Sequence, residues 1–261
     1  MRYGMAAGLA KAGLVPVVPL YSSFIQRAYD QLVHDVAIQN LPVVICADRA
    51  GIVGNDGETH QGLLDLSFTN TIPNFNIMAP KDFYELKQML DFAVNLKKPV
   101  MIRYPRGGEQ KTFETSEEIV LGKAEVLKQG EKIAIIAIGK MVSRAIEVSE
   151  ELSKNGIEAT VINARFLKPF DKETILQNIK GKKTVVTIED GTIVGGLGNK
   201  VEELIFENRL DVNLEKFAYP DEFIKHGSTD EIEEKYGLDV GSIVECLKSQ
   251  EKNIKIVSTS C

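Results

Sequence analysis

Residues 21–62 read YSSFIQRAYDQLVHDVAIQNLPVVICADRAGIVGNDGETHQG, and this segment indicates the fold class most clearly. Apolar residues recur at helical spacing from residue 27 to residue 40, and Pro42 ends the helix that this spacing predicts. The next five residues are continuously apolar, which indicates a strand buried on both faces. A long loop follows, because residues 48–62 are rich in Gly, Asp and Asn. A helix that leads into a buried strand is typical of a parallel α/β sheet.

The same alternation extends to both sides of this stretch. An apolar run over residues 15–20 predicts a strand upstream, and runs over 75–78 and 100–104 predict two strands downstream. Apolar residues on one face predict a helix over 82–96. The first domain is therefore predicted to span residues 1–107, with its ligand at the carboxyl ends of its strands.

A second alternation begins after a polar segment. Residues 108–120 contain a cluster of Glu, Ser and Thr and are predicted to be a linker. The second domain is predicted to span residues 121–250, and residues 251–261 are predicted to be a flexible tail. Both domains are expected to be α/β, each with a mainly parallel sheet flanked by helices. In the second domain the predicted strands cover 132–138, 158–162, 184–188 and 212–217, and the predicted helices cover 142–152, 172–179, 197–206, 230–236 and 240–248.

The composition excludes several classes of protein. A formal net charge of -6 over 261 residues argues against non-specific nucleic-acid binding, which needs a basic face. No run of about 18 apolar residues occurs, so no membrane span is predicted. Cys46, Cys246 and Cys261 lie far apart without a CxxC spacing, which argues against a disulfide framework and a zinc site. This cysteine usage fits a reducing cytoplasm.

Four polar residues at two predicted strand ends are the candidates for chemistry. Arg49 and Arg106 follow two strands, and an arginine offers a planar fork of donors that suits phosphate or carboxylate. His60 is a candidate for proton transfer, because histidine titrates near neutrality. Asp56 lies four residues earlier, where it could orient His60 or hold a substrate hydroxyl. Each residue alone is more often structural, but their concentration around one Gly-rich loop favours a binding site.

Three other features are interpreted as structural. His34 lies on a predicted helix away from its apolar face, and His226 lies in a turn. The glycine run over residues 194–198 precedes a predicted helix, where backbone N–H groups can hold a phosphate. The spacing does not match GxGxxG and no P-loop lysine follows, so a tight turn that packs the helix onto the sheet is favoured.

Several segments resemble the 1-deoxy-D-xylulose-5-phosphate synthases, thiamine-diphosphate enzymes related to transketolase. The resemblance extends from about residue 6 to about residue 248. The DRAG–DG–THQG loop is its most specific part, because transketolase and its dehydrogenase relatives carry other residues there. The segments are YSSFIQRAYDQLVHDVAIQNLPVV (21–44), DRAGIVGNDGETHQG (48–62), IMAPKD (77–82), IRYPRGG (102–108) and NARFLKPFD (163–171).

The resemblance implies a role for each candidate residue. The first half resembles a pyrimidine-binding domain and the second a transketolase C-terminal domain. Phe24 would stack on the aminopyrimidine ring of thiamine diphosphate, and Tyr21 and Arg27 would flank that pocket. His60 would lie near the reactive carbon of the cofactor and handle protons, and Asp56 would contact the substrate together with Tyr21.

The resemblance also implies a reaction and its partners. Arg49 and Arg106 would hold the phosphate of D-glyceraldehyde 3-phosphate. Pyruvate would be decarboxylated, and its two-carbon unit would add to the aldehyde, with thiamine diphosphate as electron sink. The resemblance further implies Mg²⁺ at the diphosphate and a homodimer for the complete enzyme.

The chain departs from the family pattern at its start. The activating glutamate of a Glu-Gln-His segment is expected at or before residue 1, and no Glu precedes Lys11. No Gly-Asp-Gly followed by a suitable Asn occurs, so the ligands of Mg²⁺ and diphosphate are expected outside this sequence. The first strand and helix of the pyrimidine domain are expected to be missing too, which would expose a sheet edge. The chain is therefore expected to be inactive alone and to need a diphosphate-binding partner, such as an N-terminal-half chain.

Two alternatives to a catalytic part of such a synthase stay open. One is a non-catalytic binding or regulatory module that keeps the fold, and the other is a different phosphate-binding α/β protein. The complete set of pocket residues weighs against both, because an idle module has no chemical need for aromatic, acidic and basic groups together.

Overall fold

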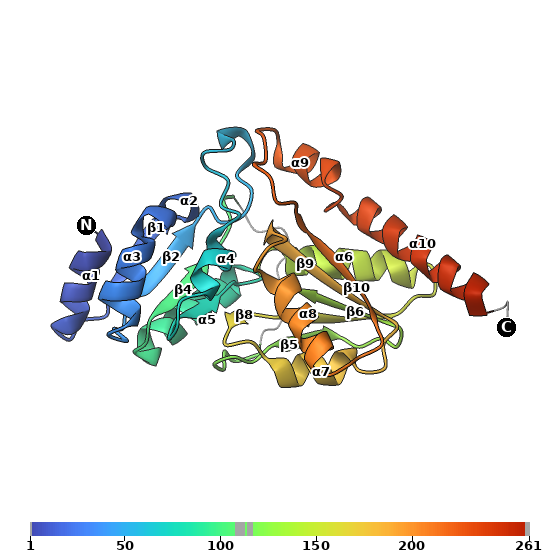
Figure 1. Cartoon of the computed structure of the whole chain (residues 1–261), viewed down its shortest axis with the longest axis horizontal. Helices are drawn as coiled ribbons and strands as arrows, with labels where there is room; N and C mark the ends of the chain where they lie inside the picture. The colour runs from blue at the N-terminus through green and yellow to red at the C-terminus, as the bar shows by residue number, and fades with distance from the viewer. Residues whose placement is uncertain (1, 108–112, 114–116, 259–261) are drawn as a thin grey trace.

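The computed structural model describes residues 2–107, 113 and 117–258. Two five-stranded sheets, each flanked by helices, follow one another along the chain (Figure 1). This confirms the predicted α/β class with two mainly parallel sheets. Most of the predicted linker lies outside the described residues, because positions 108–112 and 114–116 are among those left out.

The first sheet has the strand order β1-β2-β4-β3-β8. Neighbours among its first four strands are parallel, whereas β8 runs antiparallel to β3. All residues of β3 and β4 are buried, as their continuous apolar character predicts. The strands are β1 (Val17–Tyr21), β2 (Val44–Asp48), β3 (Asn76–Met78), β4 (Val100–Arg103) and β8 (Phe166–Lys168).

The second sheet has the order β10-β9-β6-β7-β5. Its strands are parallel except for β5, which pairs antiparallel with β7 at one edge. The pattern of the sequence did not predict the short strands β5 and β8. The strands are β5 (Glu125–Lys128), β6 (Ile133–Ala137), β7 (Ala159–Asn163), β9 (Thr184–Thr192) and β10 (Asn213–Tyr219).

The helices differ from the sequence prediction in several places. A helix α1 (Arg2–Lys11) is present at the start, which the sequence pattern did not predict. The predicted helix over 27–40 begins earlier, as short helical segments from Ser22 that end in a π-helical stretch, η2 (Leu32–Ala37). The last helix, α10 (Val240–Ser258), continues through most of the predicted flexible tail.

The remaining helical elements flank the two sheets. No helix in the described ranges combines the length and the apolar character that a membrane span requires. These elements are α2 (Ser22–Ile25), η1 (Gln26–Ala28), α3 (Tyr29–Gln31), η3 (Gly54–Asp56), α4 (Asp65–Asn70), α5 (Phe83–Leu96), α6 (Met141–Ser153), α7 (Lys172–Ile179), α8 (Leu197–Glu207) and α9 (Thr229–Lys235).

The two halves share the first sheet, because β8 comes from the second half of the chain. Ile77 pairs with Lys168, and Met78 pairs with Phe166. Just beyond these pairs, the backbone N–H of Ala79 donates to the carbonyl of Arg165 at 3.0 Å. The halves are therefore joined by backbone hydrogen bonds as well as by side chains.

A buried ionic network also joins the halves, and the NARFLKPFD segment supplies two of its members. The Arg165 side chain is 1% exposed, and its Nε lies 2.7 Å from Glu85 Oε1 while its Nη2 lies 3.2 Å from Glu125 Oε1. Lys81 Nζ lies 2.5 Å from Glu125 Oε2. Asn163 Nδ2 donates to Glu85 Oε1 at 3.1 Å. Buried charges need such partners, so this motif has a structural reason at the junction.

The Glu125 carboxylate makes the stability of this junction depend on pH. Burial alone raises its pKa, but the hydrogen bond from Lys81 and the charge of Arg165 hold the pKa of Glu125 below its ordinary value. Its contribution to stability is therefore complete above about pH 4.3, the unfolded pKa, and is lost as the pH falls through the lower folded pKa.

Replacing Glu125 with Gln should therefore lower the free energy of unfolding at pH 7. The gap between the free energies of unfolding of the variant and the wild type should become smaller in acid. Urea unfolding followed by circular dichroism over a pH series measures this gap. Glu151→Gln is the matched control, since Glu151 forms an exposed ion pair with Lys154. A gap that stays constant as the pH falls would contradict the assignment.

Candidate functional site

Three strand ends converge at one edge of the first sheet. β1, β2 and β4 are adjacent and parallel, with Tyr21 paired to Asp48 and Ala47 paired to Arg103. The loop over residues 48–62, here called the site loop, leaves β2 between the other two strands. Residues that follow these strands therefore meet, as expected for the carboxyl edge of a parallel sheet.

The two candidate arginines grip the same carboxylate oxygen. Asp56 Oδ2 lies 3.1 Å from Arg49 Nη1 and 2.8 Å from Arg106 Nη1. Arg49 and Asp56 are about 30% exposed, and Arg106 is about half exposed. Arg49 and Arg106 are called the arginine clamp below. Both guanidinium groups thus point at a single anionic position that solvent can reach.

Aromatic side chains lie next to the arginine clamp. The Arg49 guanidinium lies 4.1 Å from the centre of the Tyr21 ring, in a cation–π contact. Tyr21 stacks on Phe24 with ring centres 5.4 Å apart, and Phe24 meets the edge of His60 at 5.5 Å. Phe24 is 40% exposed. The structure therefore places six of the seven candidate residues in one continuous contact chain from Arg106 to His60.

His60 is oriented by its neighbour. Its Nδ1 lies 2.9 Å from Thr59 Oγ1. Its Nε2 makes no hydrogen bond to any residue that the structure describes, so this nitrogen is free to exchange a proton with a bound molecule.

Arg27 is the candidate that stands apart. It is exposed on η1, and its side chain makes no hydrogen bond or ion pair with the described residues. His34 is exposed, and its Nδ1 lies 2.9 Å from Asp30 Oδ1 one helical turn away. His226 lies in a loop where its Cβ approaches Gly57 of the site loop.

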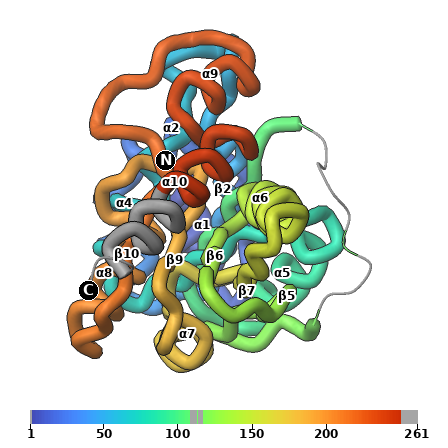
Figure 2. The backbone as a smooth tube through the Cα atoms, turned by 90° about the vertical axis from the view of Figure 1, so that its right-hand side faces the viewer, coloured from blue at the N-terminus to red at the C-terminus, as the bar shows by residue number. Residues whose placement is uncertain are grey.

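The second half of the chain holds the site loop in place. The loop is closed by a pair of backbone hydrogen bonds between Gly51 and Gly62, at 2.8 and 2.7 Å. Gln61 accepts from Val53 N at 2.8 Å and donates to the carbonyl of Lys225 at 3.3 Å. In Figures 1 and 2 the loop lies beside the segment that leads into α9. Lys225 also forms an ion pair with Glu58 of the loop.

Sequence reasoning missed a buried cluster on the second sheet that reaches the site. Asp190 is 1% exposed, and its Oδ2 lies 2.9 Å from Lys140 Nζ. Lys140 Nζ is also 3.2 Å from Glu233 Oε1. Burial alone lowers the pKa of Lys140, but the two carboxylates raise it above its ordinary value. The signal was available, because Asp190 follows a predicted strand just as Arg49 and Arg106 do.

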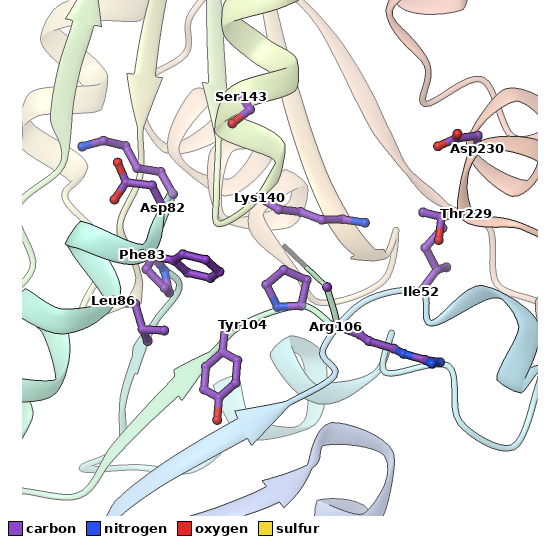
Figure 3. Close-up of a pocket in the computed structure, with 14 residues that line it drawn as sticks. Ile52, Asp82, Phe83, Leu86, Tyr104, Arg106, Lys140, Ser143, Thr229 and Asp230 are labelled. Carbon is purple, nitrogen blue, oxygen red and sulfur yellow. The ribbon is translucent and has the colours of Figure 1, made fainter. Parts of the chain in front are cut away.

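A cavity of about 270 Å³ lies between the halves beside the clamp. Figure 3 shows Arg106 and Lys140 extending toward Ile52 and Thr229 on one side of it, with Phe83 on the other. The cavity thus connects the clamp to the buried cluster of the second sheet.

The glycine run packs α8 against an internal carboxylate. Glu189 accepts hydrogen bonds from Leu197 N and Gly198 N, both at 2.8 Å. A Cβ on Gly196 would lie 2.0 Å from Glu189 Oε2, so only glycine leaves room for this carboxylate. The donors at the start of α8 already bind a carboxyl group of the chain itself, which agrees with the structural interpretation of the run.

Two transketolase domains match the chain in succession. Residues 2–109 match the pyrimidine-binding domain of transketolase, and residues 122–243 match its C-terminal domain. A solved structure described as "Split gene transketolase, inactive beta4 tetramer" superposes with a TM-score of 0.85 at 30% identity, covering 94% of this chain and 79% of that chain. The chain belongs to the transketolase family. A transketolase from Campylobacter jejuni, 20% identical with a TM-score of 0.79, shares the fold.

Within the transketolase family, the chain is similar to proteins named 1-deoxy-D-xylulose-5-phosphate synthase, which confirms the resemblance. The protein from Natranaerobius thermophilus is 50% identical over 236 residues, which are 89% of this chain and 37% of that protein. The protein from Caldanaerobacter subterraneus subsp. tengcongensis is 48% identical over 252 residues, which are 96% of this chain and 40% of that protein. The chain thus spans about two fifths of the length of these relatives.

Proposed function

We propose that this chain carries the pyrimidine-binding and C-terminal domains of a 1-deoxy-D-xylulose-5-phosphate synthase. The reaction joins pyruvate and D-glyceraldehyde 3-phosphate with loss of CO₂. The observation that carries the proposal is the arginine clamp, whose two guanidinium groups meet at one anionic position beside the aromatic residues. A phosphate ester and a flat heterocycle are what such a site suits.

The residues around Phe24 fit the ring of thiamine diphosphate. Phe24 has an exposed surface for a flat heterocycle, and its Tyr21 and His60 contacts hold the ring in place. When bound, the cofactor supplies the electron sink for decarboxylation. The described residues contain no cluster of three or more His, Cys, Asp or Glu placed to bind a metal. We propose that a diphosphate-binding domain, in the same or another chain, holds Mg²⁺ and the diphosphate.

Each protein group then has a defined task. The arginine clamp binds the phosphate of the aldehyde substrate and fixes the distance of its carbonyl from the aromatic residues. Asp56 neutralises the clamp when phosphate is absent and orients the substrate when it is present. His60 exchanges a proton through Nε2 with the substrate oxygen, while Thr59 holds its other nitrogen.

Reconstitution tests the proposal. The relative described as a split-gene transketolase is an inactive tetramer by its title, so we expect this chain alone to be inactive as well. Mixing it with a matching N-terminal half, thiamine diphosphate, Mg²⁺ and both substrates should yield 1-deoxy-D-xylulose 5-phosphate, measured by mass spectrometry. No product from a stable, cofactor-loaded complex would contradict the proposal.

The clamp gives this complex a specific kinetic signature. Arg106→Ala should raise KM for the phosphorylated aldehyde about 10–100-fold, since hydrogen bonds to charged groups contribute about 1.5–3 kcal/mol. The KM for pyruvate should change little. Arg209→Ala is the matched control, because Arg209 is exposed and far from the clamp in sequence. Equal rises in both KM values would argue against a phosphate role.

A further inference from the structure

Asp190 contacts both segments that carry the arginine clamp, although it belongs to the other half of the chain. Its Oδ1 accepts a hydrogen bond from Ile52 N at 3.2 Å, three residues beyond Arg49. Its backbone carbonyl accepts from Arg103 Nη2 at 2.9 Å, three residues before Arg106. One buried residue therefore contacts the segments next to both clamp arginines, and Arg103 is held in addition by Asp65, whose Oδ2 lies 2.9 Å from Arg103 Nε.

The site loop packs onto the Asp190 carboxylate without spare room. A Cβ placed on Gly51 would lie 1.6 Å from Asp190 Oδ2. Gly51 also has a φ of +78°, which favours glycine. The loop backbone therefore has no freedom to move toward β9, and the hydrogen bond from Ile52 opposes movement away from it.

The Asp190 carboxylate is also held by charged side chains of the second half of the chain. Lys140 bridges Asp190 and Glu233 at 2.9 and 3.2 Å. Glu233 lies 2.6 Å from Arg144 Nη2, and Arg144 Nη1 donates to the carbonyl of Leu238 at 2.6 Å. Three elements of the second half thus fix Asp190, so the anchor of the site loop is rigid.

We propose that Asp190 is a positioning residue that sets the separation of Arg49 and Arg106 for a phosphate monoester. The inference rests on the proposed function of the clamp. A common anchor for two donors keeps them at the spacing that one phosphate requires, and a shift of about 1 Å in such geometry is costly. Asp190 itself does not touch the substrate. Its effect is therefore on phosphate affinity, transmitted through Gly51, Ile52 and Arg103.

A double-mutant cycle on the whole chain tests this coupling. Asp190→Ala removes the carboxylate that accepts from Ile52 N and keeps the backbone carbonyl that accepts from Arg103, whereas Gly51→Ala pushes the loop off an intact carboxylate. We expect each single variant to weaken binding of inorganic phosphate about tenfold, which corresponds to about 1.4 kcal/mol. The double variant should lose less affinity than the sum of the two single losses, because the space for the new methyl group is then open and only the backbone strain at Gly51 remains. Phosphate binding is followed at the Nε–H resonances of Arg49 and Arg106.

A second readout does not depend on phosphate. Hydrogen exchange at the Ile52 amide and in the site loop should accelerate at least about tenfold in Asp190→Ala. Glu125→Ala is the matched control for loss of a buried carboxylate between the halves, and it should leave both readouts unchanged. Gly156→Ala is the control for Gly51→Ala, since Gly156 has a φ of +75° with no atom within 4 Å of a new Cβ.

The outcomes distinguish the positioning role of Asp190 from the phosphate role of the arginine clamp. Unchanged loop exchange in Asp190→Ala, or unchanged phosphate affinity with faster exchange, would overturn the positioning role. Additive losses in the double variant would overturn it too, because the contact between Gly51 and Asp190 would then not transmit the effect. If the wild-type chain shows no phosphate binding, the clamp assignment fails, and the inference falls with it even where exchange identifies Asp190 as a loop anchor.

Discussion

Replacing His60 with Ala should reduce kcat of the reconstituted complex about 10²–10⁴-fold, the usual contribution of a positioned acid–base group. The reason is geometric. The ring lies against Phe24 and its Nδ1 faces Thr59, so Nε2 is the nitrogen left for the substrate. His60→Gln should lose as much, because Gln keeps a polar side chain of similar reach but does not titrate near neutrality. Initial rates over a range of pyruvate concentrations measure the effect.

The control for this change is His34→Ala. His34 is exposed and, among the residues that the structure describes, pairs with Asp30 one helical turn away, so its loss should leave kcat unchanged. The KM for pyruvate should change far less than kcat in His60→Ala, since the lost interaction acts in the transition state. Full activity of the complex without the imidazole would show that His60 takes no part in the reaction.

Replacing Arg165 with Met should destabilise the fold by about 3–5 kcal/mol, the cost of leaving buried charge unpaired. Arg165 is 1% exposed and bonds Glu85 and Glu125 together. Its Nη2 also donates to the carbonyl of Glu117 at 3.0 Å. Without it, two buried carboxylates share Lys81. Urea unfolding at pH 7 measures the loss in the free energy of unfolding.

The chain offers a control with the same backbone conformation. Arg165 has a φ of +53°, and the exposed Arg209 has a φ of +51°. Arg209→Met therefore makes the same change of side chain at a left-handed position without the network, and should alter stability by less than about 0.5 kcal/mol. If both variants lost a similar free energy of unfolding, the left-handed backbone conformation and not the ionic network would be the cause. A loss below about 1 kcal/mol in Arg165→Met would show that the network contributes little.

The parts of the fold that local pattern controls could be predicted from the sequence. Continuous apolar runs predict buried parallel strands. The predicted positions of β2 and β4 are therefore close to the observed ones. Because parallel neighbours end at the same edge, the meeting of Arg49 and Arg106 followed from that prediction. Helix α1 was missed although Tyr3 and the alanines at 6, 7 and 10 have helical spacing.

What the sequence pattern did not reveal depends on contacts between distant segments. β8 has three residues and becomes a strand only because β3 offers it an edge. The link from Asp190 to Ile52 joins two halves of the chain, and no local periodicity encodes it. The exposed position of Arg27 also depends on where the helical segment after β1 begins, which is the least reliable part of such a prediction.

The strand β8 also bears on the order in which the protein is made. During synthesis, β1 to β4 leave the ribosome well before β8, so the edge of β3 stays open until most of the second sheet has been translated. An open edge can pair with other chains during that interval. The first sheet is therefore complete only when the second half has begun to fold, and the biogenesis of the two halves is coupled.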